Sequence, residues 1–180
     1  MKKISSYDIL TGFIIENRAS AYRLAYSYVH NKEDALDILQ DAICKALASV
    51  RTLQDSASVK PWFFRIIVNT ALDFIRKNKR YVYVEEDTLE SLSQSTEDQY
   101  EDFDLVSALE KLSSINKTIV MLRFYEDMKL EDIAGILGMN LNTVKTRLYA
   151  SLKKLRIEME AAEGSGAGLR QYRKGDGKNE

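Results

Sequence analysis

The chain has 180 residues, which leaves room for one domain or two small ones. Its 26 Lys and Arg residues nearly balance 27 Asp and Glu residues, so the net charge of −1 indicates no particular class of partner. There are only 8 Gly and 1 Pro, and most of the glycines follow Glu163, so the body lacks the frequent turns that a β-sandwich or β-barrel needs. We therefore predict an all-α fold.

The chain has one cysteine, one histidine and no long apolar run, which argues against a disulfide-bonded protein, a histidine metal site and a membrane-spanning protein. The single Cys44 cannot form an internal disulfide, and the single His30 cannot build a histidine metal site. The chain reaches acidic Asp8 before any apolar segment, unlike a secretory signal, and no apolar run approaches the ~18 residues of a membrane span. We expect a cytoplasmic protein that inserts into no membrane and needs no metal or cofactor.

Apolar periodicity predicts two helices before residue 50. Apolar residues recur at three- and four-residue spacing over residues 9–29. Asn31 then provides an N-cap for a second helix, whose apolar stripe covers residues 35–47. The acidic residues of this helix lie on a face away from the stripe: Asp34, Asp37 and Asp41.

A third helix is predicted over residues 61–76. Pro61 suits its first turn, where the missing N–H group costs nothing. Trp62, Phe63 and Phe64 are consecutive and cannot all face one way, so at least one ring is expected near the surface. Exposed rings beside basic groups suit single-stranded nucleic acid, although packing in a three-helix core is the more ordinary role for Phe63 and Trp62.

The charges are unevenly distributed along the chain. Residues 85–104 contain nine acidic residues and no Lys or Arg, whereas residues 60–80 contain six basic residues and residues 141–156 contain five. Two basic segments on either side of an acidic connector suggest two surfaces for a polyanion, but charge alone slightly favours a solvated connector between two ordinary charged helix faces.

The acidic segment is interpreted as a flexible linker over residues 84–103, because it lacks sustained periodicity. Twenty residues reach roughly 70 Å at ~3.4 Å each, so the two halves need not touch. Beyond the linker, helices are predicted near residues 104–111, 116–125, 130–137 and 140–161. The predicted organisation is a helical domain (1–83), the acidic linker (84–103), a helix-turn-helix domain (104–162) and a disordered tail (163–180).

Residues 130–148 fit a helix-turn-helix. Small Ala134 stands where two helices cross closely, and Gly138 can adopt the positive φ of a tight turn between them. Asn140 or Asn142 can cap the second helix. A helical hairpin without a ligand is the alternative, but turn, core and an acid-free basic face coincide here, which favours DNA binding. The residues available to reach base edges are Thr143, Lys145, Thr146, Arg147 and Tyr149.

Three stretches resemble the extracytoplasmic-function sigma factors of bacterial RNA polymerase. They are residues 33–41 (EDALDILQD), 62–76 (WFFRIIVNTALDFIR) and 143–148 (TVKTRL), and the resemblance spans residues 13–156. It implies two small helical domains and no catalysis. The implied function is that of a sigma factor, which binds core RNA polymerase and directs promoter recognition and opening through the minus-ten and minus-thirty-five elements.

The resemblance also implies roles for particular residues. Core RNA polymerase would contact Asp34, Asp37, Gln40 and Asp41. Minus-ten DNA would be bound by Trp62, Arg65, Asn69, Asp73, Arg76, Lys77, Lys79 and Arg80. The minus-thirty-five duplex would be read by the five helix-turn-helix residues named above. An anti-sigma factor, commonly membrane-tethered in this family, is a further expected partner.

Two other classes of function are weighed against this one. A stand-alone, dimeric helix-turn-helix regulator would bind a palindromic duplex tightly without polymerase. A nucleic-acid enzyme has little support, because no nucleophile is paired with a base and Cys44 is expected on a buried helix stripe.

Overall fold

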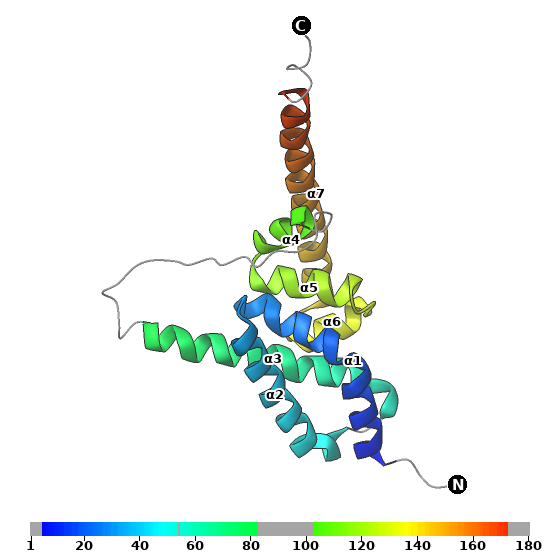
Figure 1. Cartoon of the computed structure of the whole chain (residues 1–180). Coiled ribbons are helices and arrows are strands. Elements are labelled where there is room, and N and C mark those ends of the chain that lie inside the picture. The colour runs from blue at the N-terminus through cyan, green and yellow to red at the C-terminus, as the bar shows by residue number, and fades with distance from the viewer. Residues whose placement is uncertain (1–4, 54, 83–102, 173–180) are drawn as a thin grey trace, which may run out of the picture.

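The computed structural model describes residues 5–53, 55–82 and 103–172, and within these ranges every regular element is a helix. The all-α expectation is confirmed (Figure 1). The first half contains α1 (Ser6–Val29), α2 (Lys32–Ser49), the short 3-10 helices η1 (Val50–Thr52) and η2 (Ser56–Ser58), and α3 (Val59–Val82). The second half contains α4 (Phe103–Glu110), α5 (Ser114–Phe124), α6 (Leu130–Leu137) and α7 (Leu141–Tyr172).

Local capping explains where α1 and α2 begin and end. Ser5 and Asp8 form a capping box at the start of α1. His30 ends α1 in the left-handed conformation, with a φ of 53°. The predicted N-cap Asn31 follows at once, and its side-chain oxygen accepts hydrogen bonds of 2.8 and 3.0 Å from the second and third N–H groups after it. Two residues therefore suffice to reverse the chain between the helices.

The first three helices pack against one another as the predicted bundle. The inner side of α2 is built from buried alanines with Ile38, which lets the neighbouring helices approach closely. Cys44 is exposed, which corrects the expectation that it lies on the buried stripe. It is two positions from both Ala42 and Ala46, and a two-residue step turns about 200° around a helix, away from the stripe.

The helix-turn-helix forms as predicted by α6, a turn and α7. Gly138 ends α6 with a φ of 62°, in the left-handed region that favours glycine. Asn140, rather than Asn142, provides the cap, because its side-chain oxygen accepts a 2.8 Å hydrogen bond from the N–H of Asn142. The core between the helices is buried or nearly so and contains Ile133, Leu137, Val144 and Leu148.

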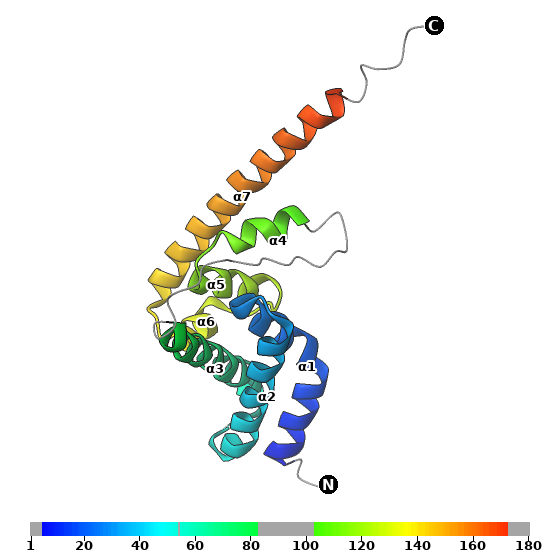
Figure 2. The ribbon, with the colours of Figure 1, turned by 60° about the vertical axis from the view of Figure 1, so that its left-hand side comes forward.

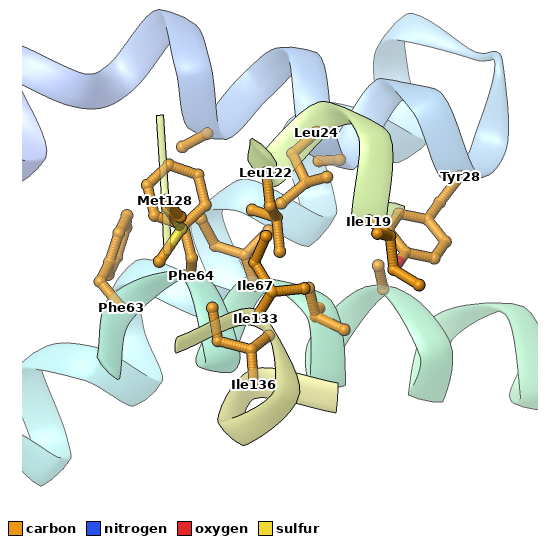
Figure 3. Packing of buried hydrophobic residues seen from close by; sticks show 14 of the residues in the cluster. Leu24, Tyr28, Phe63, Phe64, Ile67, Ile119, Leu122, Met128, Ile133 and Ile136 are labelled. Carbon is orange, nitrogen blue, oxygen red and sulfur yellow. The ribbon is translucent and has the colours of Figure 1, made fainter. Parts of the chain in front are cut away.

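The two halves pack against each other, although the sequence did not require it. Helix α3 lies against α6 and helix α1 against α5. Figure 3 shows side chains from all four helices in a single buried cluster. This arrangement explains how the consecutive rings of Phe63 and Phe64 are both buried, while Trp62 is only partly covered. Phe63 meets Phe13 of α1 edge to face, and α3 is covered on another side by the second half.

Helix α7 is longer than predicted. It continues to Tyr172, ten residues into the segment expected to be a disordered tail (Figure 2). Glycines at 164, 166 and 168 predict a disordered segment, because glycine disfavours helix. Extending an existing helix by one residue costs much less free energy than nucleating a new one, so α7 continues through them. The predicted linker residues 84–102 and the tail residues 173–180 lie outside the described residues.

Candidate nucleic-acid interface

The acidic face predicted on α2 is present and accessible. Asp37, Gln40 and Asp41 are exposed, and Asp34 is half-buried next to the N-cap. Asp41 pairs with Lys45 one turn later, at 2.8 Å between Nζ and the carboxylate. The other two carboxylates stand near one another at helical spacing. This face can offer a row of acceptors to a basic partner.

The polar face predicted on α3 runs along the outer side of that helix. Arg65 and Asn69 are exposed, and their spacing of three or four residues from Trp62 and Asp73 places all four on one face. Asp73 forms an ion pair with Arg76 at 3.2 Å. The partly exposed Trp62 ring therefore stands in line with basic and amide groups, the combination that suits single strands. Lys77 is also exposed, whereas the side chains of Lys79 and Arg80 lie outside the described residues.

Helix α7 presents most of its predicted site residues to solvent. Thr143, Lys145, Thr146 and Tyr149 are exposed, with 66% of Tyr149 accessible. Arg147 differs, because it is half-buried and donates a 3.1 Å hydrogen bond to the side-chain oxygen of Asn116 on α5. A shallow pocket lies at this end of α7 and is lined by Asn142, Thr143, Thr146 and Arg147.

Thr146 also bonds within its own helix, where its hydroxyl donates to the carbonyl of Asn142 at 2.9 Å. This bond holds the hydroxyl against the backbone and leaves the methyl group available. A methyl group suits apolar contact with thymine, while the guanidinium of Arg147 suits guanine or a phosphate. The start of α7 thus carries two chemically distinct side-chain groups within one turn, an accessible methyl group and a guanidinium.

Polar contacts between the halves were not predicted. The Tyr28 hydroxyl on α1 meets the Thr118 hydroxyl on α5 in a short hydrogen bond, and burial raises the pKa of Tyr28 to about 12. Lys60 on α3 donates to the backbone carbonyl of Glu126 at 2.6 Å and lies 3.5 Å from its buried carboxylate. No local pattern could have shown these pairs, because each joins residues 66 or more positions apart.

Lys117 is the most unusual of these residues, because it is a lysine with only 6% of its surface exposed. Its Nζ lies 3.4 Å from the carbonyl of Ser27 and 3.2 Å from the ring of His30, both at the end of α1. Burial lowers the pKa of Lys117, and Glu110 opposes that shift. Burial also lowers the pKa of His30, with a further contribution from Lys117 and opposition from Glu110.

Both halves of the chain match described protein families. Residues 13–81 match Sigma-70 region 2, and residues 102–155 match Sigma-70, region 4. The first match contains the α2 and α3 faces, and the second contains the helix-turn-helix. Among the described residues, no helix is long and apolar enough to cross a membrane.

Curated relatives match more than three quarters of the chain. RNA polymerase sigma factor SigV of Bacillus subtilis (strain 168) is 49% identical over 158 residues, covering 88% of this chain and 95% of the relative. ECF RNA polymerase sigma factor SigW of the same organism is 28% identical over 153 residues, covering 77% and 82%. The RNA polymerase sigma-E factor of Streptomyces coelicolor (strain ATCC BAA-471 / A3(2) / M145) is 30% identical over 142 residues, covering 78% and 80%.

A solved structure shares the fold. The sigma factor RpoE from Bartonella quintana, in a co-crystal with the anti-sigma factor NepR, superposes with a TM-score of 0.72. The match covers 83% of this chain and 96% of that chain, at 23% sequence identity.

Proposed function

Because this chain belongs to the extracytoplasmic-function sigma factors of bacterial RNA polymerase, we propose that it binds core polymerase through α2 and reads promoter DNA with α3 and α7. The observation that carries this assignment is the presence of three polar faces within the two matched regions, those of α2 and α3 in the first half and that of α7 in the second. Relatives of this chain are sigma factors rather than enzymes, and a sigma factor acts by positioning polymerase, without chemistry of its own.

The contact with polymerase is assigned to Asp34, Asp37, Gln40 and Asp41 on α2. Support comes from the exposure of three of these four side chains and from the helix face that they share. Carboxylates at the rim of an interface accelerate and orient the approach of a basic partner more than they add to affinity. This face would therefore fix the angle at which the first half sits on the enzyme.

Minus-ten DNA is assigned to the outer face of α3. Its exposed residues are Arg65, Asn69, Arg76 and Lys77, beside the partly exposed ring of Trp62 and the half-buried Asp73. Basic groups would neutralise phosphates of the separated strand, and a ring at the edge of the core would stack on an unpaired base, worth ~1–3 kcal/mol. Lys79 and Arg80 are also assigned to minus-ten DNA, from the sequence alone, because their side chains lie outside the described residues.

The minus-thirty-five element is assigned to the start of α7. Thr143, Lys145, Thr146, Arg147 and Tyr149 occupy the part of a recognition helix that enters the major groove. The two surfaces would each bind weakly, and attachment to polymerase would join them at high effective concentration. We therefore expect the free chain to bind duplex promoter DNA poorly.

An anti-sigma factor is the proposed regulator. Support comes from the sigma factor RpoE of Bartonella quintana, which shares this fold and was co-crystallised with the anti-sigma factor NepR. CnrH, which also shares the fold, was solved in complex with the cytosolic domain of CnrY. A partner of this kind, tethered to the membrane, would keep the chain from polymerase until released.

The decisive experiment is a pull-down with core RNA polymerase followed by run-off transcription on genomic DNA. The expected result is a stoichiometric complex that starts transcripts at a defined set of promoters, which core polymerase alone does not use. Asp37→Lys should weaken the pull-down, with Glu160→Lys on distant α7 as the matched charge control. The proposal is overturned if the chain does not bind core polymerase and instead binds a palindromic DNA duplex tightly as a dimer, without polymerase.

A further inference from the structure

A hydrogen bond ties the start of α7 to the neighbouring helix α5. Nη1 of Arg147 on α7 donates to Oδ1 of Asn116 on α5, at 3.1 Å. Both side chains are half-buried, in contrast to the exposed Thr143, Lys145 and Thr146 on the same turns of α7. Of the residues assigned to the minus-thirty-five element, Arg147 is therefore the one whose side chain is held by another helix in the part of the chain that the structure describes.

Both ends of this bond stand on fixed parts of the backbone. Asn116 is in the first turn of α5, where its N–H group donates to the hydroxyl of the N-cap Ser113 at 3.4 Å. The carbonyl of Arg147 accepts a 2.7 Å hydrogen bond from the hydroxyl of the buried Ser151. Helices α5 and α7 also pack against each other. A side chain bridged between two packed helices is positioned more precisely than one on a free surface.

The chemistry of the two groups fixes how they meet. A guanidinium has only donors, so the amide atom that faces it must be the oxygen of Asn116. The guanidinium is planar, so a bond at one corner restricts the direction of the whole group. No described residue accepts a hydrogen bond from Nε or Nη2 of Arg147. That edge is left for a bidentate contact with guanine O6 and N7 or with a phosphate.

The same guanidinium borders the shallow pocket at the start of α7. Asn142, Thr143 and Thr146 form the rest of the lining, and they belong to the part of a recognition helix that enters the major groove. An unrestrained arginine could turn away along the helix toward neighbouring phosphates. The bond to Asn116 keeps the guanidinium of Arg147 beside the pocket instead.

We propose that Asn116 is a positioning residue for the minus-thirty-five element, because its Oδ1 holds the guanidinium of Arg147 in the direction from which that group reads one base pair. Asn116 then sets a sequence preference without a base contact of its own. This role rests on the proposed function, since it requires that the start of α7 enters the major groove of the element. A merely structural residue would change the affinity for all duplexes alike, whereas Asn116 should change the selectivity between them.

Selectivity is measured with the full-length chain bound to core polymerase. The probes are a duplex with the minus-thirty-five element of a promoter found by run-off transcription, and duplexes in which each base pair of that element is changed in turn. Arg147→Ala identifies the base pair whose discrimination depends on Arg147. At that base pair, Asn116→Ala should lower the ratio of affinities for matched and changed duplexes about fivefold, because the guanidinium loses the bond that directs it.

Three further variants separate positioning from other effects. Asn116→Asp keeps an oxygen acceptor, so it should retain the parent selectivity, while its negative charge lowers the affinity for every duplex by a common factor. Combined with Arg147→Ala, Asn116→Ala should change the selectivity no further. Ser114→Ala removes an exposed hydroxyl two positions away, about 200° around α5, and should match the parent chain. Circular dichroism checks that each variant keeps its helices.

A second measurement is made on the free chain and does not depend on polymerase. The NMR signal of the Nε–H group of Arg147, assigned by its loss in Arg147→Lys, reports how freely the guanidinium moves on the ps–ns timescale. We expect its order parameter to be high in the parent chain and in Asn116→Asp, and lower in Asn116→Ala, because alanine offers no acceptor.

The outcomes separate the positioning role from the proposed function. Selectivity that is lost in Asn116→Ala and kept in Asn116→Asp supports the role. The role is overturned if Asn116→Ala keeps the parent ratios, if its effect persists without Arg147, or if Arg147→Ala shows no sequence dependence. A parent chain that does not bind core polymerase refutes the proposed function together with the reading role, and the NMR comparison then still decides whether Asn116 restrains Arg147.

Discussion

Arg147 is oriented by a neighbouring side chain before any DNA is present. Its hydrogen bond to Asn116 fixes the guanidinium against α5, which reduces the freedom lost when the group binds a base or a phosphate. We expect Arg147→Ala to weaken binding of the polymerase complex to a minus-thirty-five duplex by about 1–3 kcal/mol. The loss should depend on the sequence of the element, and fluorescence anisotropy on matched and altered duplexes measures it.

Lys153 provides the comparison on the same helix. It is exposed and lies beyond the recognition turn, so Lys153→Ala should weaken binding to every duplex by the same small factor. If Arg147→Ala also weakened all duplexes equally, then Arg147 would contact only the DNA backbone.

His30 makes the packing of the two halves against each other sensitive to acid. The groups facing it are Lys117 from α5, Glu110 from α4 and the ring of Tyr26 on α1. Burial and Lys117 hold its pKa below the ordinary 6.5. A chain with separated halves or an unfolded chain therefore binds a proton more readily, and the form with packed halves loses stability as the pH falls below 6.5.

The variant that tests this is His30→Asn, because asparagine tolerates the left-handed conformation at the end of α1 and does not titrate. Urea midpoints measured between about pH 7.5 and about pH 5.5 should fall more steeply for the parent chain than for His30→Asn. Parallel curves would show that other groups cause the acid sensitivity.

At the scale of the element, the turn between α6 and α7 depends on one backbone conformation. Gly138 has a φ of 62° and open space where a Cβ would stand, so a substitution there is opposed by the backbone rather than by a clash. Gly138→Ala should lower the free energy of unfolding by about 1 kcal/mol. Gly135→Ala, three residues earlier within α6 and equally uncrowded, should raise it by about 0.5–1 kcal/mol. The two variants should therefore shift urea unfolding in opposite directions, and shifts of the same sign would contradict the role of the turn.

The sequence predicts elements with local signals and misses what depends on distant contacts. Asn31, Gly138 and the apolar stripes predict the caps, the turn and the helix faces, because these are set by neighbours within about four residues. The burial of Phe64 and Lys117 depends on the other half of the chain, and no local pattern carries that information. Of the candidate site, the exposed faces follow from periodicity, whereas the tie between Arg147 and Asn116 does not.

At the scale of the whole molecule, the packing of the two halves against each other joins two bundles into one cooperative unit. The single tryptophan, Trp62, lies on α3 in the first half, and its fluorescence reports on that half. Far-UV circular dichroism reports on helices of both halves. Because the apolar cluster is shared between them, neither half can unfold without exposing part of the core of the other.

We expect the two signals to change at the same urea concentration in the parent chain and at different concentrations in Lys117→Glu. The reason is that a carboxylate at position 117 would face the carbonyl end of α1, which separates the halves, removes their shared core and leaves each bundle to unfold with its own stability. Lys111→Glu, whose ion pair lies within the second half, should shift the midpoint without separating the signals. Coincident transitions in Lys117→Glu would mean that the apolar cluster alone couples the halves, and that the polar contacts at the end of α1 only determine how the bundles are oriented.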